Sequence, residues 1–119
     1  MNEFGQLVDE ALAEVPGEFL PYLDNVTVTV EDWADPELRQ RLRLSGRQEL
    51  YGLYQGTPLI LRSHNHAALP DRIRIFRGPL ERDFPDLDDL RREVTRTVIH
   101  EIAHHFGIGE HRLRELGWG

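Results

Sequence analysis

A chain of 119 residues is long enough for a single hydrophobic core and little more, so we expect one domain over residues 1–119. The net charge of −7 opposes binding to the phosphates of a nucleic acid, and the absence of cysteine excludes a disulfide framework or a cysteine-ligated metal. No apolar run approaches the ~20 residues of a membrane span, and residues 1–19 lack the basic and apolar regions of a signal peptide. We therefore predict a cytoplasmic protein whose partners are neither nucleic acids nor membranes.

The start of the chain predicts a helix followed by a strand. Apolar side chains recur at helical spacing over residues 3–15, and Pro16-Gly17 interrupts this pattern before one further turn at 17–22. Residues 25–31 (NVTVTVE) alternate in β-branched residues, which is typical of a strand.

The middle of the chain predicts a loop and two more strands. The polar segment 32–48 indicates a loop with one helical turn that begins at Pro36, and residues 49–54 and 73–77 indicate strands. In and next to the last strand, three arginines interleave with apolar residues. These arginines are Arg72, Arg74 and Arg77. Because charges on a strand usually protect an exposed edge, we predict that 73–77 is an edge strand. The His-x-His pair His64 and His66 stands in the loop between these strands and is interpreted as solvent-exposed.

Residues 88–106 (DDLRREVTRTVIHEIAHHF) predict one long helix. Either Asp88 or Asp86 can cap its start, and Gly107 can end it because glycine accepts a positive φ. Apolar residues at four-residue steps predict the face that packs on the core: Leu90, Val94, Val98, Ile102 and Phe106. The elements together predict an α+β fold.

The most informative stretch of this helix is His-Glu-Ile-Ala-His at 100–104. Histidines four residues apart lie one turn above each other, so the imidazoles of His100 and His104 can reach one metal ion while Glu101 stands beside them as a base. The alternative is an amphipathic helix with two histidines at its edge. A third ligand must come from a chain that bends back after Gly107, and Glu110 follows ten residues after His100.

The segment HEIAHHFGIGEHRLRELGWG resembles the small zincin-like metallopeptidases sometimes called minizincins. The resemblance extends upstream to YGLYQGTPL at 51–59 and LPDRIRIFRGPLER at 69–82. It implies a minimal zincin-like fold, with a small mixed sheet of about three to four strands packed on a long active-site helix and an N-terminal helix. It also implies that His100 and His104 are zinc ligands and that Glu101 is the general base.

The third ligand departs from the pattern of that family. Position 110 usually carries aspartate, and here it is Glu110, which is one methylene longer and can still bind zinc. His111 is the rival ligand, and water in place of both is a third alternative. Glu115 would imitate a ligand from a second helix, but we expect it to be an exposed charge.

The resemblance implies a metallopeptidase that uses Zn²⁺ to activate water for hydrolysis of a peptide bond, with Glu101 as base. A peptide or protein substrate would pair along the predicted edge strand 73–77. One alternative function is a catalytically silent, zinc-containing module that binds peptides. Another is a structural zinc domain in which the protein fills all four coordination positions.

Overall fold

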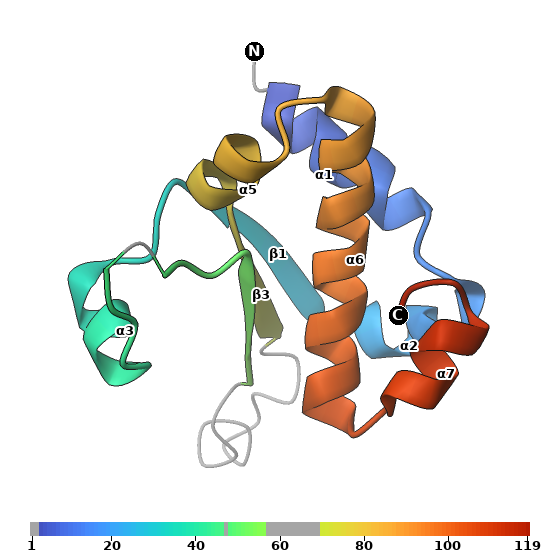
Figure 1. Cartoon of the computed structure of the whole chain (residues 1–119). Helices are drawn as coiled ribbons and strands as arrows, with labels where there is room; N and C mark the ends of the chain where they lie inside the picture. The colour runs from blue at the N-terminus through green and yellow to red at the C-terminus, as the bar shows by residue number, and fades with distance from the viewer. Residues whose placement is uncertain (1–2, 47, 57–69) are drawn as a thin grey trace.

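A computed structural model describes residues 3–46, 48–56 and 70–119, whose three strands form one mixed sheet with helices packed against it (Figure 1). The elements are, in chain order, α1 (Glu3–Ala13), η1 (Gly17–Phe19), α2 (Leu20–Leu23), β1 (Val26–Glu31), α3 (Pro36–Arg41), β2 (Gly52–Gln55), β3 (Asp71–Phe76), α5 (Arg77–Asp83), α6 (Leu87–Phe106) and α7 (Glu110–Glu115). The predicted α+β class, long helix and N-terminal helix are confirmed. The second strand begins three residues later than predicted, at Gly52.

β3 is the central strand of the sheet, so the prediction that 73–77 forms an edge is wrong. β3 pairs in parallel with β1 on one side and antiparallel with β2 on the other. Its Arg74 is buried because Glu31 of β1 accepts two hydrogen bonds from it, of 2.6 and 2.7 Å. The arginines therefore do not mark an edge: the buried charge of Arg74 is neutralised by a carboxylate from the neighbouring strand.

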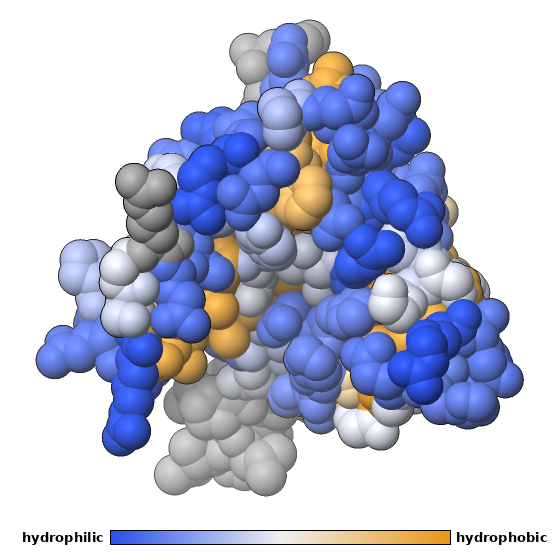
Figure 2. Space-filling model, viewed as in Figure 1, coloured by the Kyte–Doolittle hydropathy of each residue, from blue (hydrophilic) through white to orange (hydrophobic). Residues whose placement is uncertain are grey.

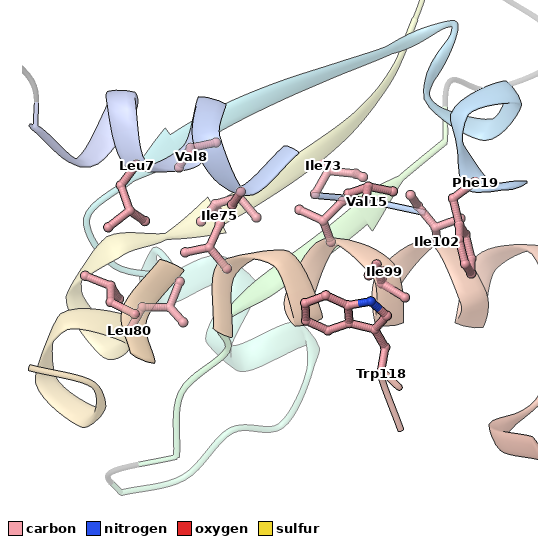
Figure 3. Packing of buried hydrophobic residues seen from close by; sticks show 14 of the residues in the cluster. Leu7, Val8, Val15, Phe19, Ile73, Ile75, Leu80, Ile99, Ile102 and Trp118 are labelled. Carbon is pink, nitrogen blue, oxygen red and sulfur yellow. The ribbon is translucent and has the colours of Figure 1, made fainter. Parts of the chain in front are cut away.

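The side chains of β3 alternate between two hydrophobic clusters on opposite faces of the sheet. Ile73 and Ile75 enter the main core, where residues of α1 and α6 pack against them (Figure 3). Phe76 belongs to a smaller cluster with Ala34 and with Leu38 of α3. The main core thus holds α6 against the face of the sheet that carries Ile73 and Ile75.

Local signals fix both ends of α6. The side chain of Asp86 accepts hydrogen bonds from two main-chain N–H groups of the first turn, at 3.0 and 3.1 Å. Gly107 ends the helix with a φ of 74°. Phe106, predicted on the core face, is instead 43% exposed and lies against Tyr22, with ring centroids 4.5 Å apart. The last turn of α6 therefore meets the α2 segment at the surface.

Hydrophilic residues cover most of the face that Figure 2 shows, with smaller hydrophobic areas between them. Among the helices that the structure describes, none combines the length and apolar character needed to cross a bilayer. His64 and His66 lie outside the described residues.

Candidate metal centre

α6 and the turn after it bring three potential metal ligands together. His100 and His104 lie one helical turn apart, with ring centroids 6.2 Å apart. Gly107 then turns the chain back, so that Glu110, the first residue of α7, places a carboxylate oxygen 4.0 Å from Nδ1 of His100. One ligand atom from each of the three residues lies within 4.8 Å of the others.

These three residues fit a zinc ion. Two imidazole nitrogens and one carboxylate oxygen are a common ligand set for zinc. Ligands of a tetrahedral zinc with bonds of about 2.0 Å lie about 3.3 Å apart, so binding requires the side chains to draw together by roughly 1.5 Å or less. Two of the three, His104 and Glu110, are exposed and have room for this movement.

The two rival ligands lie elsewhere on α7. The side chain of His111 is 85% exposed, and its Nε2 lies 3.8 Å from a carboxylate oxygen of Glu115. Neither residue belongs to the group of ligand atoms formed by His100, His104 and Glu110. Glu115 also contacts Arg112, at 3.6 Å, as expected for an exposed helix charge.

The C-terminal residues orient His100. Its Nε2 lies 2.6 Å from the main-chain oxygen of Trp118. Because a carbonyl only accepts hydrogen bonds, Nε2 must carry the hydrogen, and the lone pair of the neutral ring is left on Nδ1, the nitrogen that faces Glu110. Trp118 is 9% exposed and packs in the main core, and the centre of its ring lies 4.9 Å from the guanidinium of Arg92. This packing fixes the carbonyl that holds the imidazole.

Glu101 is held by the edge of the sheet. The main-chain N–H of Tyr54 in β2 donates a 3.0 Å hydrogen bond to Oε1 of Glu101. β2 approaches α6 closely because Gly52 has no side chain: a Cβ there would lie 2.6 Å from Cγ2 of Thr97. The close contact of strand and helix therefore depends on a glycine two residues before the donor.

Burial raises the pKa of the Glu101 carboxyl above its ordinary value, while the Tyr54 hydrogen bond and the nearby His104 and His100 act in the opposite direction. The net shift is upward. A carboxylate with a raised pKa is a stronger base than an ordinary glutamate carboxylate.

Sequence reasoning missed the residues that support this centre. The Tyr54 N–H and the Trp118 carbonyl belong to the main chain, and no pattern of residue types reveals such groups. Gly52 did carry a signal, since glycine inside a strand often marks the close approach of another element. The ring of His105, the residue after His104, stacks on the ring of Tyr54 with centroids 3.9 Å apart.

A helix that carries His-Glu-x-x-His, followed by a glycine turn and a returning carboxylate, defines a metal centre of the zincin type. Residues 23–118 match the family model described as zincin-like metallopeptidase, and the chain belongs to this family. The match spans the elements from β1 to α7 and leaves α1 outside it. No curated protein matches the chain.

Proposed function

We propose that the protein is a zinc-dependent metallopeptidase that hydrolyses peptide bonds, with His100, His104 and Glu110 as metal ligands and Glu101 as general base. The observation that carries this proposal is the convergence of the three ligand atoms within 4.8 Å, with the carboxyl of Glu101 close enough to His104 and His100 to interact with them electrostatically. Membership of the zincin-like metallopeptidase family supports it. A peptide or protein is the substrate, and a cytoplasmic location stays a prediction.

When bound, zinc would lower the pKa of a water molecule toward ~7 and polarise the scissile carbonyl. Glu101 would accept the proton of that water and pass it to the leaving amine. Because the Tyr54 N–H occupies Oε1, we assign the proton transfer to the second oxygen, Oε2. The same hydrogen bond keeps the carboxyl from rotating during the transfer.

The number of protein ligands favours a catalytic zinc site over a structural one. Structural sites are filled by four protein ligands, whereas catalytic sites keep one position for water. Three described residues form the ligand group, and His111 contacts Glu115 instead of joining them. The described part of the chain therefore leaves a coordination position for water.

The proposal is tested by digesting a peptide mixture with the zinc-loaded protein and reading the products by mass spectrometry. Glu101→Gln preserves the size of the side chain and an oxygen for the Tyr54 N–H, so zinc should stay bound while hydrolysis falls at least ~100-fold. The matched control Glu115→Gln changes an exposed glutamate of α7 and should leave hydrolysis unchanged. His100→Ala should lower the zinc content measured by elemental analysis.

Hydrolysis that survives Glu101→Gln would show that another group is the base. If the zinc-loaded protein bound peptides without cleaving them, the molecule would instead be a peptide-binding module. Such a peptide would not pair with β3, because β1 and β2 occupy both of its sides.

A further inference from the structure

A second feature of the molecule is a cavity of about 260 Å³ at the C-terminal end of α6. Its walls come from α2 and the residues after it, from the first residues of β1 and β3, from β2 and from the last residue of α6. The lining residues that carry the following argument are Tyr22, Asp24, Tyr54, Asp71 and Phe106. None of them is a proposed metal ligand or the proposed base, so the cavity is a different site from the metal centre.

Aromatic rings form one side of this cavity. The ring centroid of Phe106 lies 4.5 Å from that of Tyr22 and 5.8 Å from that of Tyr54, and the planes of Phe106 and Tyr54 are 84° apart. His105 covers one face of Tyr54, whereas Phe106 is 43% exposed despite its apolar side chain. The face of an aromatic ring attracts a cation that lies within about 6 Å of its centre. A ligand in the cavity can therefore reach an aromatic surface that favours positive charge.

The same cavity is lined by two carboxylates. Asp24 is exposed and Asp71 is partly exposed, so solvent or a ligand can reach both residues. Oδ2 of Asp71 accepts a 2.6 Å hydrogen bond from the hydroxyl of Tyr54, which places this carboxylate at the edge of the aromatic cluster. No arginine or histidine is among the described residues that line the cavity. Its described lining is therefore aromatic and negatively charged.

We propose that this cavity binds a positively charged side chain of a peptide or protein, arginine or lysine. The rings contact the cation, and the carboxylates neutralise its charge. Arginine fits best because its planar guanidinium can stack on a ring while two of its N–H groups donate to one carboxylate. The inference goes beyond the proposed peptidase function and does not depend on it, since the catalytic residues take no part in this binding.

Other ligands fit less well. The two carboxylates repel an anion, and a neutral aliphatic chain would separate them from water without neutralising them. A metal ion is not favoured either, because Asp24 and Asp71 do not belong to a convergent group of three potential ligands among the described residues. Pockets for whole small molecules usually measure about 300–1,000 Å³, so a cavity of 260 Å³ is better matched to a single side chain.

The test is a titration of the ¹⁵N-labelled, zinc-loaded protein followed by NMR. The probes are the Nα-acetyl amides of arginine, citrulline, lysine and norleucine. Citrulline has the shape of arginine and norleucine resembles the stem of lysine, but both are neutral. We expect each cation to bind about 10-fold more tightly than its neutral counterpart, with the largest changes in amide shift at Tyr22, Tyr54 and Phe106. Equal affinities of charged and neutral probes, or shift changes confined to other residues, would overturn the inference.

Two variants link the preference to the cavity. Phe106→Leu keeps an apolar side chain but removes the exposed ring, so the preference for arginine over citrulline should fall below about 3-fold. Asp24→Asn keeps the size of an exposed side chain but removes its charge, and the preference should fall in the same way. The matched control Asp9→Asn makes the same change of net charge on an exposed residue of α1 and should leave the preference as it is.

The NMR spectrum of each variant also shows whether it is folded. If Phe106→Leu is not folded, Asp24→Asn decides, because its side chain is exposed and the substitution removes no buried group. An unchanged preference in the folded variants, or an equal fall in Asp9→Asn, would overturn the inference.

The results separate this inference from the proposed function because binding is measured without hydrolysis. Selective binding of arginine by a zinc-loaded protein that cleaves no peptide would keep the cation site and remove the peptidase. Cleavage of peptides by a protein that binds arginine and citrulline equally would keep the peptidase and remove the cation site.

Discussion

The contact between β2 and α6 at Gly52 gives a quantitative prediction. A Cβ at this position would lie 2.6 Å from Cγ2 of Thr97 and 3.1 Å from the main-chain oxygen of Arg74. Two carbon atoms in favourable contact lie about 3.5–4.0 Å apart, so the alanine methyl would overlap Thr97 by roughly 1 Å. Gly52→Ala must push the strand away from the helix, and overpacking of this kind costs about 1–3 kcal/mol of unfolding free energy.

A double-mutant cycle with Thr97→Ser isolates this contact. Serine lacks Cγ2 but keeps the hydroxyl that donates a 2.8 Å hydrogen bond to the main-chain oxygen of Glu93. The serine variant alone should lose about 1 kcal/mol for one buried methyl group. In its background the cost of Gly52→Ala should fall by about 1 kcal/mol, with the remainder due to the tight approach to Arg74.

The assay is urea unfolding followed by tryptophan fluorescence, with linear extrapolation to water. Gly17→Ala serves as the control, because a Cβ at Gly17 meets no atom within 4 Å and its φ is not in the left-handed range. The control should be neutral or slightly stabilising. The reasoning is refuted if Gly52→Ala behaves like this control, or if the two substitutions add within about 0.3 kcal/mol.

Two further predictions concern the sheet and the C-terminal residues. The hydrogen bonds from Arg74 hold the pKa of Glu31 below its ordinary value of 4.5, so the pair stabilises the fold above that pH and this contribution is lost as the pH falls through the folded pKa. Urea unfolding between pH 6 and pH 3 should therefore show a steeper loss of stability in the wild type than in Glu31→Gln, and parallel curves would contradict this. Deleting residues 118–119 removes both the Trp118 ring and the carbonyl that orients His100, whereas Trp118→Ala removes only the ring. Zinc affinity, measured by competition with a chelator, should fall about 10–100-fold in the deletion and less in Trp118→Ala, and an unchanged affinity in the deletion would show that the carbonyl has no role.

The sequence predicted α6 and its ends because those signals are local. The Asp86 cap, the Gly107 turn and the four-residue spacing of the histidines all lie within one or two turns of the positions they control. The ligand group could be proposed for the same reason, since His100 and Glu110 are ten residues apart along the chain.

Interactions between distant segments were not predictable in this way. The partner that buries Arg74 is Glu31, 43 residues away, so the alternation of arginine with apolar residues was interpreted as an edge. The donor to Glu101 is 47 residues away and is a main-chain group.

The hydrogen bond from β2 to Glu101 places little restriction on which amino acid occupies position 54. The donor at position 54 is an amide that every amino acid except proline supplies, so this support of the proposed base survives nearly any substitution of Tyr54. The ring of Tyr54 can therefore change with its neighbour His105 while the carboxyl keeps its donor. Distant homologues could differ at this position in side-chain size, charge and polarity and still present Glu101 in the same orientation.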